Sequence, residues 1–394
     1  MITKSPLIWH LPDWPSLKAL APGVATAQLD ARQWLGQVQG LYSALGLDPA
    51  AASVQDMWLQ ETLATSAIEG ETLNPASVRS SVMRRLGLDD QGLGPRDDRV
   101  DGLVAMLDDA ARRHDVPLDE ERLWGWHAAL FPTGFSGVTR IRVGHYRDHA
   151  DAMQIVSGLP GREVVHYTAP PSARVADEMQ AFLAWFASTH PARKGEHGLD
   201  GLTRAAIAHL WFESIHPFED GNGRMGRAIV DLALAQDCGS PLRMISLSQQ
   251  LLAQRKAYYA ALHAAQHGGS SDVSPWVQWF LSQVVAACRH ASGLLETAQQ
   301  RSRFWARHSA VAPNARQRKV LQRLLDAGDG GFLGGLNADK YTQLTGASKA
   351  TATRDMAQLV QNGLLFVRGQ GKATRYFVNV PGWEHAAPSK EVRP

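Results

Sequence analysis

The stretch that decides the fold runs His216-Pro-Phe-Glu-Asp-Gly-Asn-Gly-Arg-Met-Gly-Arg227. It follows an apolar helical pattern over residues 199–214. That helix must end near the start of the stretch, because Pro217 disfavours the α conformation in the residue before it. A second helical pattern begins after the glycines and covers residues 224–236. The stretch therefore predicts two helices joined by a tight, glycine-containing loop.

The loop between these helices has the composition of an anion-binding site. Gly221 and Gly223 permit positive φ, and Asn222 tolerates it, so successive backbone N–H groups can converge on one point. The N-terminus of the next helix adds free N–H groups and the positive end of a dipole. The alternative interpretation is an ordinary Gly-Asn-Gly turn. The loop lacks the lysine of a Walker phosphate loop.

The charged residues of the stretch favour a polyphosphate as the anion. Arg224 and Arg227 are three residues apart, so we expect them to share a face in the first turn of the helix. Two arginines there oppose the dipole unless an anion lies between them. Asp220 is a carboxylate of the kind that Mg²⁺ shares with phosphate oxygens. His216 can take a proton from a hydroxyl at neutral pH, although a histidine before proline can also be a simple helix-end residue.

The stretch resembles the Fic family motif, His-Pro-Phe-x-Asp-Gly-Asn-Gly-Arg-x-x-Arg, at every fixed position. The resemblance implies a helical protein that transfers AMP from ATP to a Ser, Thr or Tyr hydroxyl of a protein. It also implies that His216 is the general base, that Asp220 holds Mg²⁺ and that Phe218 is a buried anchor. The nucleotide-binding residues would be Gly221, Asn222, Gly223, Arg224, Met225, Gly226 and Arg227, with the glycines and Asn222 as the anion hole and the arginines on the outer phosphates.

Two further segments fit the same resemblance. Residues 154–158 and 162–167 are short, partly β-branched runs on either side of Leu159-Pro-Gly161, which predicts a lone β-hairpin. It resembles the family's flap, which aligns a target segment by strand addition. Tyr259 lies in a stretch that resembles part of the family's adenine pocket, and an ordinary buried tyrosine is the alternative.

The segment Thr65-Ser-Ala-Ile-Glu-Gly70 resembles the family's inhibitory motif, Ser/Thr-x-x-x-Glu-Gly. By that resemblance Glu69 pairs with Arg227 and takes the place of the γ-phosphate, since an arginine bound by a carboxylate cannot hold ATP. The alternative is an ordinary surface glutamate near a helix end. Removal of AMP through the same glutamate stays open.

Length and composition place the chain among multi-domain intracellular proteins. With 394 residues and 44% hydrophobic residues, we expect two or three domains with sizeable cores. No apolar run is long enough for a membrane span, and the N-terminus lacks a secretory signal. Two cysteines are too few for a disulfide framework or a Cys-based zinc site. We therefore expect a cytoplasmic protein with no membrane partner.

The C-terminal part is basic. Residues 301–394 carry 15 Lys and Arg against 6 Asp and Glu, a net charge of +9, whereas residues 1–300 carry 25 against 32, a net of −7. Helical patterns over 315–327, 338–344 and 348–363 precede a strand, a glycine turn and a strand over 364–378, an order that resembles a winged helix-turn-helix. Four residues would face a DNA groove and two would meet phosphates on the wing, namely Lys349, Thr351, Thr353 and Arg354, and Lys372 and Arg375. Protein contact or dimerisation is the alternative.

These patterns predict a mainly α protein: a Fic helical bundle with a β-hairpin flap, plus a C-terminal winged helix domain. We expect an N-terminal helical segment with the inhibitory motif over 1–110, a catalytic core over 111–300 and the winged helix over 315–380. The first functional hypothesis is an autoinhibited protein AMP-transferase that uses ATP and Mg²⁺ on an unidentified target protein or on itself, as a monomer or a homodimer. The second is a DNA-binding regulator whose Fic body senses nucleotide or binds a partner. Transfer of another nucleotide or of phosphocholine stays open, because the loop binds a diphosphate and not the base.

Overall fold

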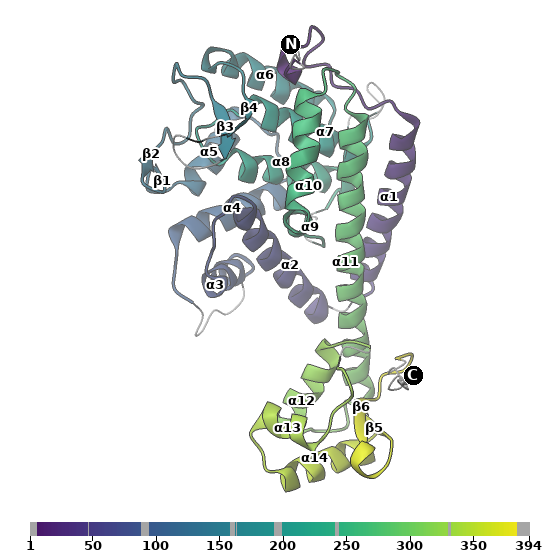
Figure 1. Cartoon of the computed structure of the whole chain (residues 1–394). Helices are drawn as coiled ribbons and strands as arrows, with labels where there is room; N and C mark the ends of the chain where they lie inside the picture. The colour runs from purple at the N-terminus through teal and green to yellow at the C-terminus, as the bar shows by residue number, and fades with distance from the viewer. Residues whose placement is uncertain are drawn as a thin grey trace. The chain divides into compact units, whose positions relative to one another are not determined.

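The computed structural model describes residues 6–45, 47–87, 94–157, 162, 164–192, 199–240, 244–329 and 332–383. The chain divides into two compact units (Figure 1). The first unit comprises Met1–Ala44 and Ala50–Ser292, and the second comprises Leu45–Pro49 and Gly293–Pro394. Within the described ranges, every helix is too short or too polar to cross a membrane.

The first unit is helical apart from two short hairpins, which confirms the predicted mainly α class. Its helices begin at capping side chains in several places, where a side-chain oxygen accepts a backbone N–H of the first turn. The helices are η1 (Ile8–His10), α1 (Pro22–Ser43), α2 (Leu47–Ile68) from Ala50 onward, α3 (Pro75–Arg85), α4 (Asp98–Arg112), α5 (Glu120–Leu130), α6 (Ser172–Ser188), α7 (Gly201–Ile215), α8 (Asn222–Cys238), α9 (Leu247–Ala253), α10 (Arg255–His267) and the N-terminal half of α11 (Ser274–Arg307).

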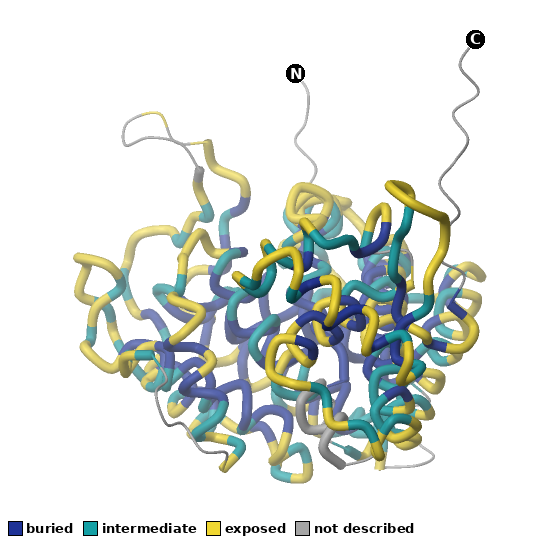
Figure 2. The backbone as a smooth tube through the Cα atoms, turned by 90° about the horizontal axis from the view of Figure 1, so that it is seen from below, coloured by how far each residue is buried: buried dark blue, intermediate teal, exposed yellow. Residues whose placement is uncertain are grey.

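The centre of the first unit is the pair α7 and α8, which lie side by side and are joined by the short loop after His216. All fifteen residues of α7 are buried, including the polar side chains of Arg204, His209 and Glu213, so this helix lies at the centre of the core. Figure 2 shows how the buried segments gather inside the chain trace while exposed residues line the outside. The loop therefore lies between two helices that are held rigidly by the core.

Two hairpins interrupt the helices of the first unit. β3 (Gln154–Ser157) pairs antiparallel with β4 (Val164–Thr168), as the sequence predicted, and a register shift falls between Ile155 and Val156. The predicted turn at 159–161 lies outside the described residues. The prediction that this hairpin stands alone was wrong, because β1 (Phe135–Ser136) pairs with β2 (Thr139–Arg140). Strands of two residues are too short to show an alternating pattern.

Residues 246–266 have a continuous helical pattern but form two helices, because the backbone of Gln254 (φ −109°, ψ 28°) leaves the α region and separates α9 from α10. The N-terminal segment before α1 is held against the first unit by two of its tryptophan side chains. Trp9 donates to the Thr168 carbonyl at 2.9 Å, and Trp14 donates to Glu178 at 2.7 Å.

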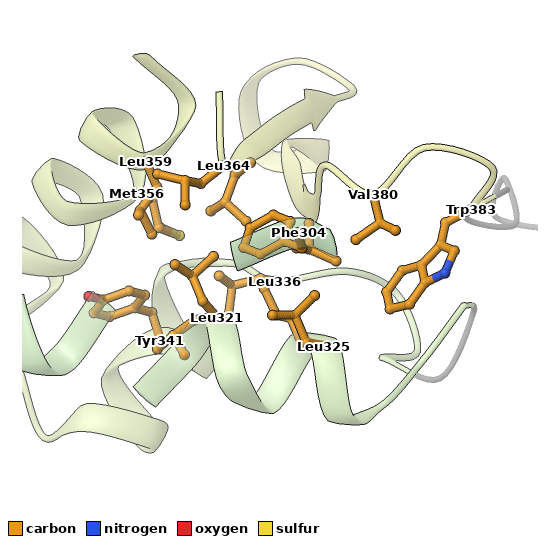
Figure 3. Close-up of a cluster of buried hydrophobic side chains, with 14 of the residues drawn as sticks. Phe304, Leu321, Leu325, Leu336, Tyr341, Met356, Leu359, Leu364, Val380 and Trp383 are labelled. Carbon is orange, nitrogen blue, oxygen red and sulfur yellow. The ribbon is translucent and has the colours of Figure 1, made fainter. Parts of the chain in front are cut away.

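The second unit holds the rest of α11, three short helices and one hairpin. Its elements are α12 (Ala315–Asp326), α13 (Ala338–Thr345), α14 (Lys349–Gln361), β5 (Leu365–Arg368), η2 (Gly371–Ala373) and β6 (Arg375–Val378). Figure 3 shows its core, in which apolar side chains from the helices and the hairpin gather around Phe304 of α11. The order of elements is the one predicted from the sequence, while the assignment to the winged helix class stays a prediction.

Candidate active site

The loop after α7 begins with a strained residue. His216 has φ 51° and ψ 61°, the one positive φ among the described residues other than glycine, and it caps α7 in the left-handed conformation. The loop is closed by Asn222, whose side chain accepts from the Phe218 N–H at 2.9 Å and donates to the Phe218 carbonyl at 2.8 Å. Phe218 is fully buried, as expected for the anchor. The imidazole is thus presented by a rigid turn, and such strain often accompanies function.

The glycines act differently from the sequence prediction. Gly221 has φ +80°, but Gly223 does not have positive φ, because α8 begins at Asn222, two residues before the predicted start. Arg224 therefore lies in the first turn of α8 and Arg227 lies beyond it, so the prediction that both lie in the first turn was wrong. A Cβ on Gly223 would collide with Glu69 Oε1, so a side chain at this position would displace the Glu69 carboxylate.

His216 is held as a neutral imidazole. Burial, followed by the positive charge of Arg147, lowers its pKa to about 4. Its Nδ1 lies 3.9 Å from Glu213 Oε2. Arg147 in turn donates from Nε to the His216 carbonyl at 2.8 Å and from Nη2 to the Pro170 carbonyl at 2.6 Å. At neutral pH the ring can therefore accept a proton.

Glu213 lies one turn before His216 and was not singled out from the sequence. Burial, followed by the negative charge of Glu69, raises the pKa of Glu213 to about 8. A Cβ at Gly226 would lie 2.5 Å from Glu213 Oε1, so this glycine, which was expected to contact nucleotide, makes room for the buried carboxyl group. The neighbouring Met225 is fully buried in the core.

Arg227 is engaged by the segment that resembles the inhibitory motif. Its Nη2 lies 2.8 Å from Glu69 Oε1. Its Nε donates to Thr65 Oγ1 at 2.7 Å, and Nη2 donates to the Thr65 carbonyl at 2.9 Å. The Arg227 side chain is 3% exposed and that of Glu69 is 31% exposed. The pairing is the one expected from the resemblance, while its inhibitory role stays a prediction.

Arg224 has a carboxylate partner that the sequence analysis missed. Its Nη1 lies 2.9 Å from Glu71 Oε2, and its Nη2 lies 3.9 Å from Asp220 Oδ1. Its guanidinium carbon lies 5.1 Å from the ring centroid of Phe131. Glu71 follows the Glu-Gly pair of the motif directly, so no motif position pointed to it.

Several buried polar atoms around the loop have no hydrogen-bond partner among the described residues. An unsatisfied buried polar atom typically costs about 1–3 kcal/mol. A cluster of such atoms at one place is expected where a polar ligand binds. The atoms are Ser66 Oγ, His209 Nδ1, Glu213 Oε1, His216 Nδ1, Arg224 Nε and Arg227 Nη1.

Asp220 fits the role of a Mg²⁺ ligand that is shared with phosphate. Its Oδ1 accepts from the Gly221 N–H at 2.6 Å, Ser136 donates to its Oδ2, and its side chain is 43% exposed. The described residues contain no group of three or more His, Cys, Asp or Glu that could hold a metal ion. Mg²⁺ needs no such group when one carboxylate, water and phosphate oxygens supply its octahedral shell.

Tyr259 and the hairpin lie at the border of the site. Tyr259 is 40% exposed, and its hydroxyl donates to the Ile68 carbonyl at 3.3 Å, at the end of α2. The buried tyrosine is its neighbour Tyr258, whose hydroxyl lies 2.7 Å from His209 Nε2. In β4, the Tyr167 hydroxyl donates to the Ser214 carbonyl at 2.9 Å and so ties the hairpin to the end of α7.

Comparison with known families identifies the domain that holds this site. Residues 117–234 match the model of the Fic/DOC family, and residues 7–88 match one described as Domain of unknown function (DUF4172). The chain therefore contains a Fic/DOC domain, as the motif at 216–227 predicted.

Relatives and solved structures agree with this assignment. The chain is 33% identical over 99 residues to Protein adenylyltransferase fic-1 of Caenorhabditis briggsae, a match that covers 25% of this chain and 18% of that protein. It is 25% identical over 226 residues to Protein adenylyltransferase Fic of Drosophila ananassae, which covers 57% and 40%. The chain thus spans less than half the length of either relative. A Fic family protein from Desulfovibrio desulfuricans G20 shares the fold, with a TM-score of 0.52 at 21% identity over 92% of this chain and 97% of that chain.

Proposed function

We propose that the Fic/DOC domain of this chain is an autoinhibited protein AMP-transferase, which moves AMP from ATP to a Ser, Thr or Tyr hydroxyl of a target protein or of the chain itself. The observation that carries the proposal is a largely enclosed His216, whose lowered pKa keeps it neutral, beside a loop in which Glu69 occupies Arg227. The names of the relatives, protein adenylyltransferases, support the reaction class.

In this reaction the target oxygen attacks the α-phosphorus of ATP, pyrophosphate leaves, and the hydroxyl proton passes to His216. Because Nδ1 of His216 faces Glu213, we assign Nε2 as the proton acceptor. The N–H groups from Gly221 to Gly223 lie at the positive end of α8, where they can stabilise the charge that develops on the transferred phosphate. Arg224 and Arg227 bind the outer phosphates. Mg²⁺ held by Asp220 would neutralise phosphate charge when bound.

Autoinhibition follows from where the Glu69 carboxylate lies. It occupies the space above Gly223 and pairs with Arg227, so an outer phosphate cannot reach that arginine while Glu69 stays. Displacing Glu69 would free one charged hydrogen-bonding group of Arg227 for ATP. The same carboxylate beside the loop leaves the reverse reaction, removal of AMP, open to test.

The β3–β4 hairpin suits a target segment in extended form. Val156, Val164 and Val165 are exposed on it although they are large apolar residues. An extended peptide that adds to such a strand would place its hydroxyl residue beside α7, to which Tyr167 anchors the hairpin. Tyr259 borders the end of the inhibitory segment, and we propose that it contacts the adenine.

The test is to incubate the wild type and the Glu69→Gly variant with Mg²⁺ and ATP labelled in the α-phosphate, alone and with cell lysate. We expect covalent label on the variant itself or on lysate proteins, and little with wild type. Mass spectrometry of the labelled proteins then identifies the transferred group and the modified residue. Equal labelling by wild type and variant would show that Glu69 is not inhibitory. Labelling from another nucleotide, but not from ATP, would show that the enzyme transfers a nucleotide with a different base.

A second candidate function is DNA contact by the second unit. The exposed residues of α14 are neutral or cationic, while its one carboxylate, Asp355, is buried. Lys349, Thr353 and Arg354 are exposed on α14, Thr351 is half-buried, and Lys372 is exposed beyond β5. A mobility shift of duplex DNA at physiological salt tests this function. Homodimerisation through the same face is the competing outcome, which sedimentation of the chain without DNA would show.

A further inference from the structure

We propose that Glu71 is a positioning residue that holds Arg224 ready for the nucleotide after Glu69 has released Arg227. The inference rests on the proposed function of the same loop and deepens it. It assigns opposite roles to two glutamates that are two residues apart and that each engage one arginine of α8.

The backbone at the end of α2 explains how both glutamates reach α8. The N–H groups of Glu69 and Glu71 both donate to the Ser66 carbonyl at 3.0 Å. Gly70 between them has φ +85°, a conformation that residues with a side chain rarely adopt. This turn fixes the spacing of the two carboxylates, so that they match the spacing of Arg224 and Arg227.

The two carboxylates differ in where they lie. Glu69 Oε1 occupies the space that a side chain on Gly223 would need, and it therefore lies inside the loop. Glu71 instead lines a cavity of about 220 Å³, together with Arg224, and Glu69 is not among the lining residues of that cavity. Only Glu69 takes the place of a phosphate, whereas Glu71 flanks that place.

Arg224 keeps donors for a ligand while Glu71 holds it. Glu71 engages Nη1, whereas Nε has no partner among the described residues and Nη2 lies 3.9 Å from Asp220 Oδ1. The guanidinium also lies over the ring of Phe131. A cation that is 6% exposed and held from two sides needs little rearrangement to receive a phosphate.

The charges around the loop favour the same division of roles. When Glu69 leaves, Arg227 keeps Thr65 as its partner through two hydrogen bonds. Among the described residues, two carboxylates lie within ion-pair distance of Arg224: Glu71 at 2.9 Å and the more distant Asp220 at 3.9 Å. Without Glu71 this buried cation would lose its nearest counter-charge and its fixed orientation before the nucleotide arrives. Glu71, which stays paired with Arg224, therefore supports nucleotide binding and does not act as a second inhibitory residue.

The experiment adds Glu71→Gln to the Glu69→Gly variant. The amide keeps the shape of the side chain but removes the charge. We measure ATP affinity by calorimetry in Mg²⁺ buffer, and labelled AMP transfer over a range of ATP concentrations. We expect about tenfold weaker ATP binding and a raised KM with a smaller change in kcat, because Arg224 loses the ion pair that fixes its orientation before the nucleotide binds. Glu71→Asp should restore part of the affinity, and Glu69→Gly/Glu121→Gln, altered at an exposed glutamate in the first turn of α5, is the matched control.

The outcomes separate this inference from the proposed function. If Glu71→Gln with Glu69 intact raises transfer, Glu71 is a second inhibitory residue and the inference is wrong. Unchanged ATP affinity of Glu69→Gly/Glu71→Gln would also overturn it. If no variant transfers label but ATP affinity still falls with Glu71→Gln, the proposed function fails while the role of Glu71 stands.

Discussion

Two clusters of a carboxylate and an arginine, one in each unit, have similar composition but differ in how fully their polar atoms are satisfied. In each cluster one partner is buried and the other is more exposed: Arg227 is buried and Glu69 partly exposed, whereas Asp355 is buried and Arg316 exposed. In the first unit, Glu69 and Arg227 pair at 2.8 Å, and Arg227 Nη1 beside them has no partner among the described residues. In the second unit, Asp355 accepts from the Tyr341 hydroxyl at 2.8 Å and from Arg316 Nε at 3.1 Å, and no side-chain atom of Asp355 or Tyr341 is left buried without a partner.

The difference indicates which cluster serves the fold and which serves a ligand. A satisfied network fixes the elements it joins, and the Asp355 cluster joins α12, α13 and α14. A cluster with unsatisfied donors loses stability unless something anionic completes it. The comparison therefore predicts that changes in the first cluster alter reaction rate, whereas changes in the second alter stability.

The largest expected effect is on the reaction. In the Glu69→Gly background, His216→Ala should lower AMP transfer about 10²–10⁴-fold, the usual contribution of a general base. ATP affinity should change little, because the arginines and the loop N–H groups remain. Initial rates with labelled ATP, together with calorimetry, measure the two quantities. Loss of ATP binding in parallel with transfer would mean that His216 supports the loop and is not the base.

The next effect is on stability against acid. Burial is the main cause that lowers the pKa values of His127, His209 and His216 to about 4, 3 and 4, so between pH 6.5 and 4.5 these residues bind protons only when the first unit unfolds. The stability that they contribute is present above pH 6.5 and is lost as the pH falls. Glu213, with its pKa raised to about 8, has the opposite sign and offsets one of the three. The balance of two protons corresponds to on the order of 2–3 kcal/mol per pH unit.

The second unit should not share this acid sensitivity. Burial raises the pKa of Asp355, but the hydrogen bonds from Tyr341 and Arg316 together lower it below that of a free aspartate. The stability that Asp355 contributes is therefore lost only at a more acidic pH than that of the buried histidines. Hydrogen exchange on the intact chain from pH 7 to 4.5, resolved by peptide, can follow the two units separately. We expect protection to fall first in α7 and α8. A simultaneous loss of protection in α12 to α14 would contradict the prediction that acid sensitivity belongs to the first unit.

A smaller effect distinguishes the clusters by isosteric amides. Asp355→Asn removes the charged acceptor that receives hydrogen bonds from Tyr341 and Arg316, and it should lower the free energy of unfolding of the second unit by about 1–3 kcal/mol, with transfer unchanged. Glu69→Gln should raise transfer and change stability less, because its side chain is 31% exposed. Thermal unfolding and labelled transfer on both variants test the contrast. If Asp355→Asn changes the rate of AMP transfer as strongly as Glu69→Gln does, the proposed difference between the two clusters is wrong.

Much of this site follows from local sequence. Pro217 ends α7, Gly221 supplies the positive φ of the turn, and Phe218 is buried because it is apolar and enclosed by the loop. The prediction that Glu69 pairs with Arg227 came from the resemblance of two segments, about 160 residues apart, to motifs of one family. The structure contains that contact. These features depend on residues within one turn or on a complete motif, which a sequence displays directly.

The missed features depend on long-range packing. Arg147 reaches the His216 carbonyl from 69 residues away, and nothing in its neighbourhood marks it. Glu71 lies outside the motif, and Glu213 is a polar residue inside an apolar helix, which gives no sign of its charge state. The break at Gln254 has no glycine or proline to announce it. Each depends on neighbours that only the folded chain brings together.

The smallest expected effect lies on the surface of the second unit. Arg354→Ala should leave the stability of that unit within about 0.5 kcal/mol, since exposed side chains contribute little. If α14 contacts DNA, the same change should weaken DNA binding a few-fold. It should also reduce the slope of log K against log salt concentration by about one, because one phosphate contact is lost. Lys349→Ala should weaken it less, because Lys349 already pairs with Asp339 at 2.7 Å. Arg303→Ala, an equal change of charge on exposed α11, is the control. DNA affinity is measured by fluorescence anisotropy at two salt concentrations. An equal loss of affinity in Arg303→Ala and Arg354→Ala would show that binding depends on the overall charge of the unit and not on a contact made by α14.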